Sequence, residues 1–202
     1  MRAPSIRTRR IVTLSSAPVA VLLAGLMVWQ GSNAAFTADT RNIGNNWETG
    51  SVAISDDDGG AAMFQISNVI PGQTGEKCIA VTATSSVASD VKFYTGDLAS
   101  DGLEPYVMVT IERGTGGSFA GGCGAFTPES PAVVEASQSL AALGGHNSWA
   151  TSILPWTKTA GSVTKTYKFS WVFDTTSLTQ LQIDALQGHG ASINFEWELQ
   201  NS

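Results

Sequence analysis

The sequence predicts an all-β fold, either a β-sandwich or a barrel. Three observations indicate it: several short stretches alternate apolar and polar residues with period two, glycine-rich turns separate them, and few stretches favour a helix. Many short strands with few helices are typical of sandwiches and barrels. The chain shows neither an internal repeat nor a linker between residues 47 and 200, so we expect one β domain over 47–202.

The strongest strand signals lie in the stretches 163–173 and 191–199, where every second residue is large and apolar. This period places the apolar side chains on one dry face and leaves the other face wet. Further strands are expected at 51–54, 62–67, 77–84, 90–95 and 106–112. The inward-facing residues of the two strongest strands would be Tyr167, Phe169, Trp171 and Phe173, and Ile193, Phe195, Trp197 and Leu199.

Turns are expected at 56–60, 71–75 and 113–124, where glycine, aspartate and proline cluster. One helix is expected at 131–143, because Pro131 suits a first helical turn and two glycines follow Leu143. A shorter helix is expected within 177–188. The predicted domain therefore carries one or two short helices in its connections.

The first 34 residues predict a secretory signal peptide in the form of a helix. Four arginines and no acidic residue precede an apolar run over 11–28, and Ser32 and Ala34 have the spacing that a signal peptidase needs. We place the cut between Ala34 and Ala35. The alternative is a membrane anchor, since the run approaches the length that spans a bilayer.

The chain after the cut is acidic. Of the eleven basic residues four lie in the leader, whereas all seventeen acidic residues follow it, which leaves a net charge of −10 over 35–202. A nucleic-acid partner would need a basic face, so this charge argues against one. We expect a secreted, extracellular protein that contacts the membrane only through its uncut leader.

Two cysteines, Cys78 and Cys123, remain in the exported chain. An even number in an oxidising compartment predicts a disulfide, with two buried free thiols as the alternative. Without a CxxC pair they do not predict a zinc site.

The sequence offers little for catalysis. Its two histidines, His146 and His189, lie among glycines in expected loops, and no metalloprotease, hydrolase or phosphate-loop motif occurs. A Ser-His-Asp site assembled in space stays an alternative to two exposed loop histidines. The aspartates at 56–58 could bind Ca²⁺ but lack the spacing of an EF-hand, so a solvated turn is the better interpretation. We predict no enzyme, no catalytic residue, no metal and no cofactor.

Three tryptophans leave a binding role open. Trp47, Trp149 and Trp156 are expected near loop or strand ends, where aromatic rings can stack on sugars. A monomeric binding module for glycans or another surface ligand is therefore the alternative function.

Several stretches resemble the TasA/camelysin family of exported proteins that a SipW-type signal peptidase cuts. These are Ala34 to Phe36 at the cleavage site, Trp47 to Ile54, Ser67 to Gly72 with its Pro-Gly turn, Cys78 to Ser86, and Ile193 to Gln200 at the end. The middle of the chain, 96–162, departs from the better-known members and is closer to versions in high-GC Gram-positive bacteria. The resemblance implies a jelly-roll β-sandwich, a place at the cell surface, and self-association into fibres of the biofilm matrix, alongside matrix or cell-wall partners.

The resemblance also implies roles for the residues after the cut. Residues 35–46 would form a flexible tail that inserts into the next subunit, with Phe36, Thr37, Ala38 and Asp39 as the assembly residues. An extended peptide can add a strand to an exposed sheet edge. Camelysin is described as a metallo-endopeptidase, but the two histidines here lie 43 positions apart without a helical zinc motif, which argues against that activity.

Overall fold

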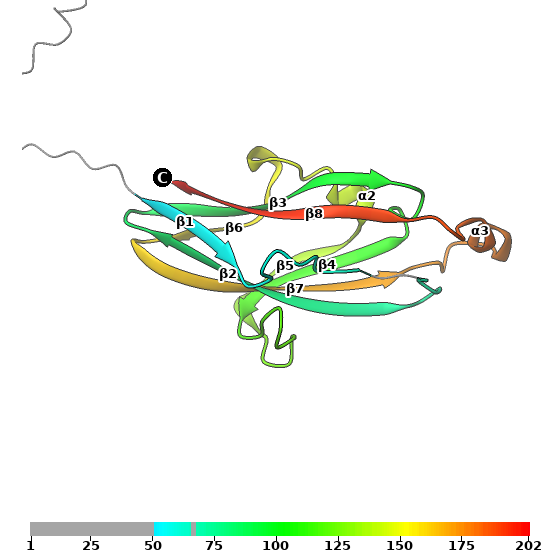
Figure 1. Ribbon diagram of the computed structural model, residues 1–202, viewed down its shortest axis with the longest axis horizontal. Coiled ribbons are helices and arrows are strands. Elements are labelled where there is room, and N and C mark those ends of the chain that lie inside the picture. Colours follow the sequence, from blue (N-terminus) through cyan, green and yellow to red (C-terminus); the bar gives the residue numbers. More distant parts are fainter. Residues whose placement is uncertain (1–50, 66–67) are drawn as a thin grey trace, which may run out of the picture. The chain divides into compact units, whose positions relative to one another are not determined.

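Eight strands over the described residues, 51–65 and 68–202, form two antiparallel sheets, which confirms the predicted all-β sandwich (Figure 1). This arrangement comes from a computed structural model. The expected signal peptide helix, its cleavage site and the tail over 35–46 lie outside the described residues. One compact unit spans Thr49–Ser202.

The two sheets differ in size. The five-stranded sheet has the order β1 (Val52–Asp56), β2 (Thr74–Ser85), β7 (Gly161–Phe173), β4 (Val107–Thr115) and β5 (Thr127–Ser139). The three-stranded sheet has the order β6 (Ile153–Lys158), β3 (Ser89–Ser100) and β8 (Ala191–Asn201).

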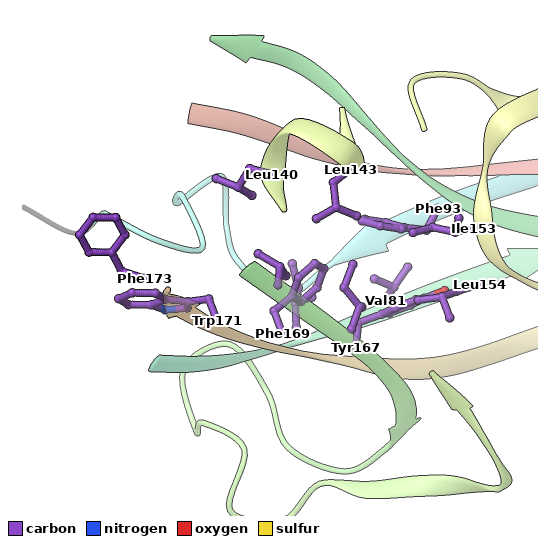
Figure 2. Close-up of a cluster of buried hydrophobic side chains, with 13 residues drawn as sticks. Val81, Phe93, Leu140, Leu143, Ile153, Leu154, Tyr167, Phe169, Trp171 and Phe173 are labelled. Atoms are coloured by element: carbon purple, nitrogen blue, oxygen red, sulfur yellow. The ribbon is translucent and has the colours of Figure 1, made fainter. Parts of the chain in front are cut away.

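The core lies between the sheets and follows the predicted period of two. Tyr167 and Phe169 of β7 are fully buried, and Trp171 and Phe173 continue the same row toward the end of the strand (Figure 2). Phe93 of β3 meets this row from the opposite sheet, with its ring centroid 5.8 Å from that of Phe169. Aromatic pairs at such distances contribute beyond the apolar area that they bury.

Short helices occupy the connections. They are α2 (Leu140–Leu143), the 3₁₀ helix η1 (Trp149–Thr151) and α3 (Gln180–Ala185). The α3 helix falls within the expected range 177–188. It begins at Thr179, whose hydroxyl accepts a hydrogen bond from the amide of Gln182 while the Gln182 side chain bonds back, a reciprocal cap that explains the start.

The helix predicted at 131–143 is wrong over 131–139, which belong to β5. Within the part of the chain that the structure describes, β5 is an edge strand that pairs with β4 alone, with Val133 opposite Arg113. An edge position tolerates Pro131, and the adjacent valines favour an extended backbone. The pairing with β4 therefore overrides the helix preference of the alanine and glutamate residues.

Two further predictions differ from the structure. The strand expected at 62–67 is absent over 62–65, where Met63 and Phe64 instead pack against the core from an irregular segment. Conversely, β6 was not expected, because Pro155 and a left-handed Leu154 (φ 51°) interrupt its pattern. β6 is an edge strand of the three-stranded sheet, so its pairing with β3 rather than its periodicity determines its backbone.

A disulfide joins Cys78 to Cys123, as predicted, with a Cα–Cα distance of 5.3 Å. Cys78 is fully buried in β2, so the bond ties the glycine-rich loop after β4 onto this strand. Within the described part of the chain, no helix is both long and apolar enough to cross a bilayer.

Candidate functional site

One edge of the five-stranded sheet is only partly covered. β2 has twelve residues, but β1 pairs with its last five alone, from Asp56 opposite Val81 to Val52 opposite Ser85. Figure 1 shows β1 ending well before it reaches the start of β2. Among the described residues, no strand pairs with Thr74–Ala80 on this side, which we call the free edge.

The backbone groups of the free edge can be assigned by alternation. The amide of Ala80 points outward, since it donates to the Asp57 carboxylate at 2.8 Å. Neighbouring residues of a strand point their N–H and C=O groups to opposite sides. Cys78, Glu76 and Thr74 therefore point theirs to the same side as Ala80. Cys78 is fully buried, so the donor–acceptor pairs of the exposed residues Glu76 and Thr74 are the ones available to another strand.

An apolar groove of about 790 Å³ opens beside the free edge. It lies between the first half of β8 and the segment that follows β1. Its apolar walls combine side chains from both sheets and from that segment. They include Phe64, Ile79, Trp171, Ile193, Phe195 and Trp197.

Gly75 on the free edge shapes one wall of the groove. It lies directly opposite Trp171 of β7, and a Cβ atom at Gly75 would lie 2.6 Å from the indole nitrogen. The absence of a side chain lets the indole lie across the β2 backbone. Glycine is therefore required here for a steric reason, which the sequence did not reveal.

The rim of the groove is mainly acidic. Asp56, Asp58, Glu196 and His189 are its ionisable residues. Burial raises the pKa of the Asp56 carboxyl, and its contact with Asp58 adds to the increase. Two close carboxylates on the rim favour an occupant without further negative charge.

The aspartates at 56–58 form a turn, as predicted, and the carboxylates of Asp57 and Asp58 also accept hydrogen bonds from backbone amides. Asp58 accepts a hydrogen bond from the amide of Gly60 at 2.6 Å, and both following glycines have positive φ. Asp57 instead reaches across to β2 and closes the β1–β2 ladder with its side chain.

The two histidines lie in different connections. His146 follows α2 and its Nδ1 lies 2.8 Å from the Thr151 carbonyl oxygen. His189 precedes β8 and contacts the Asp101 carbonyl. In the residues that the structure describes, no three His, Cys, Asp or Glu side chains form a group that could hold a metal.

The tryptophans do not share one loop surface. Trp156 lies in β6, is buried, and donates to the Tyr167 hydroxyl at 2.9 Å, so its expected place near a strand end is right but its accessibility is wrong. Trp149 is half-buried in η1, with the Lys92 ammonium 4.4 Å from its ring centre. Trp47 lies outside the described residues.

Sequence comparison adds no assignment: no protein-family model matches the chain, and no curated protein sequence matches it either.

Proposed function

We propose that the protein is a secreted subunit of cell-surface or matrix fibres, in which the tail of one copy adds a strand to the free edge of the next. One observation carries the proposal: beside an apolar groove, seven residues of β2 have no strand partner among the described residues on one side. Such edges are templates for pairing, and native proteins usually blunt or cover them. The resemblance to the TasA/camelysin family supports the same interpretation.

The tail over 35–46 has the composition of such a strand. Its twelve residues, at about 3.4 Å each when extended, exceed the length of the free edge. Phe36 is the only large apolar residue before Ile43, and the groove offers an aromatic surface around Phe195 and Trp197. Burial of one Phe side chain is worth about 1.5–3 kcal/mol, and each backbone hydrogen bond adds about 0.5–1.5 kcal/mol.

The geometry of β1 favours a neighbouring copy as the acceptor. The chain enters β1 at Val52, opposite Ser85, whereas the free edge lies at the other end of β2. β1 itself occupies the intervening stretch of that edge. To pair with the free edge of its own copy, the chain before β1 would have to turn back past β1, whereas the edge of another copy requires no such turn.

Cleavage of the signal peptide would control the assembly. The cut between Ala34 and Ala35 would place Phe36 one residue from the new amino terminus. Before the cut, the leader holds the same residues at the membrane. Export and cleavage would then release a tail that is ready to pair outside the cell.

The proposal is tested with the mature chain, residues 35–202. Deletion of Phe36–Arg41, with Ala35 kept, should give folded monomers that no longer form fibres in electron micrographs. Phe36→Ser should weaken assembly and leave the melting temperature nearly unchanged, because the strands of the core all follow the tail. Asn45→Ser is the matched control, since it lies in the same tail but outside the proposed assembly residues, and it should assemble normally.

Two outcomes would contradict it. If the truncated protein polymerises like the intact chain, the tail is not the joint. If the truncated protein unfolds, the tail belongs to the core of its own subunit.

The second candidate function is a monomeric binding module. The groove favours it, since a volume of about 790 Å³ falls within the usual range of about 300–1,000 Å³ for small-molecule sites. An apolar ligand in the groove would change the fluorescence of Trp171 and Trp197. Saturable quenching by such a ligand, with a chain that stays monomeric in gel filtration, would favour this function over fibres.

A further inference from the structure

We infer that Asp57, together with the disulfide-anchored loop that carries Phe119, acts as a register stop for the strand that enters the free edge. The inference rests on the proposed function and adds what determines how the incoming strand is aligned. It is carried by hydrogen bonds of Asp57, by the position of Cys78, and by the placement of Lys77.

Asp57 closes one end of the free edge with both carboxylate oxygens. Oδ1 accepts from the amide of Ala80 and Oδ2 accepts from the amide of Phe119, each at 2.8 Å. The next residue that would continue the β1 ladder is Asp57 itself, so its side chain replaces the missing backbone acceptor. A carboxylate that accepts two amide hydrogen bonds holds its place firmly.

The disulfide fixes the partner of this carboxylate. Phe119 belongs to the loop between β4 and β5, and Cys123 of this loop is bonded to Cys78 on the free edge itself. Gly117 of the loop lies against Cys78, where a Cβ atom would be 3.4 Å from the sulfur. The loop therefore cannot move away from the edge while the disulfide is intact.

The same loop holds the positively charged side chain of Lys77 away from the groove. Lys77 alternates with Gly75 and Ile79, so it belongs to the core-facing side of the free edge. Its ammonium lies 4.1 Å from the centre of the Phe119 ring and Lys77 does not line the groove. An inward-pointing lysine commonly protects a sheet edge from pairing. Here the Phe119 ring instead holds the Lys77 ammonium beside the loop.

These contacts limit where an incoming strand can pair. The Ala80 amide is already occupied and Cys78 is fully buried against the loop, so the open pairs are those of Glu76 and Thr74, where β2 begins. A slip by one residue would turn every side chain of the incoming strand to the other face. A fixed end therefore sets the register of the incoming strand, and with it which of its side chains face the groove.

The test compares Asp57→Ala with Asp184→Ala in the mature chain. Asp184 has the same charge and is also exposed, but it lies in α3, outside the groove lining, and its carboxylate accepts a local hydrogen bond from Gln180. We expect Asp57→Ala to lower the pelleted fibre fraction at least fivefold and to abolish the regular axial repeat in electron micrographs. Asp184→Ala should stay within twofold of the unmodified chain and keep its repeat.

Phe119→Ala is the second variant, in case Asp57→Ala fails to fold. It keeps the backbone amide but removes the ring beneath Lys77, and we expect at least a twofold loss of pelleted fibre with an unchanged monomer melting temperature. If unmodified chains form no fibres, the proposed function fails and this inference with it. If they form fibres and Asp57→Ala and Phe119→Ala match Asp184→Ala, the register stop alone is wrong.

Discussion

Arg113 should be the most costly charged residue to remove from the sandwich, because it joins the two sheets. Its side chain, in β4, is almost fully buried. Nε and Nη2 donate to the Glu129 carboxylate at 3.1 and 2.8 Å, and Nη1 donates to the carbonyls of Leu154 and Pro155 in β6 at 2.9 and 2.8 Å. Four hydrogen bonds thus connect β4 both to β5 and to the opposite sheet.

Arg113→Met keeps much of the volume and removes all four bonds. Breaking a buried ion pair typically costs about 3–5 kcal/mol. Lys165 remains 2.6 Å from the other Glu129 oxygen and is partly exposed, so Glu129 keeps one partner. We therefore expect a loss of about 2–4 kcal/mol, measured as the free energy of unfolding in urea at pH 7.

Lys168→Met is the matched control. Lys168 lies 3.1 Å from Glu76 on the outer face of the same sheet, where half of the Glu76 side chain is exposed. Such surface pairs contribute about 0–1 kcal/mol. If Arg113→Met costs no more than Lys168→Met, the connection between the sheets is not what stabilises this side of the sandwich.

The effect should also depend on pH. The hydrogen bond from Arg113, with a smaller contribution from Lys165, lowers the pKa of Glu129 below its ordinary value. A lowered folded-state pKa stabilises the fold above the unfolded-state pKa of about 4.3, and this contribution is lost as the pH falls through the folded value. The difference between the native chain and Arg113→Met should therefore shrink from pH 6 to pH 3. A constant difference would contradict the assigned ion pair.

Two further predictions concern the groove and the histidines. Gly75→Ala should displace the Trp171 indole and lower the free energy of unfolding in urea by about 1–3 kcal/mol. Gly124→Ala is the control and should cost less than about 0.5 kcal/mol, because a Cβ atom there meets nothing within 4 Å. Equal costs would show that the indole does not need this space. Replacing His146 and His189 together by Ala should leave fibre assembly unchanged; loss of bound zinc and of a casein-degrading activity in this variant would instead indicate a metalloprotease.

Much of the fold follows from period-two patterns. Tyr167, Phe169 and Trp171 alternate with polar residues because β7 lies centrally in its sheet with one face on the core, and this local rule needs no knowledge of the neighbours. β5 lacks such a pattern. Its residues are largely exposed and rich in alanine and glutamate, so only the pairing with β4 makes them a strand.

The candidate site was less accessible to sequence reasoning. The free edge arises because β1 stops after five residues while β2 continues for seven more, a relation between two strands that neither pattern contains alone. Asp57 was expected only to form a turn, since nothing near it in sequence indicates the amides of Ala80 and Phe119. The need for glycine at position 75 likewise depends on the indole of Trp171, which lies almost one hundred positions away in the sequence.

The central claim is that a strand from another copy pairs with the free edge of β2. Amide hydrogen exchange of β2, measured on mature monomers and on fibres, tests it directly. We predict that the amides of Thr74 and Glu76 exchange rapidly in the monomer and become protected at least a hundredfold in fibres. Fibres in which these two amides exchange as fast as in the monomer would contradict the claim.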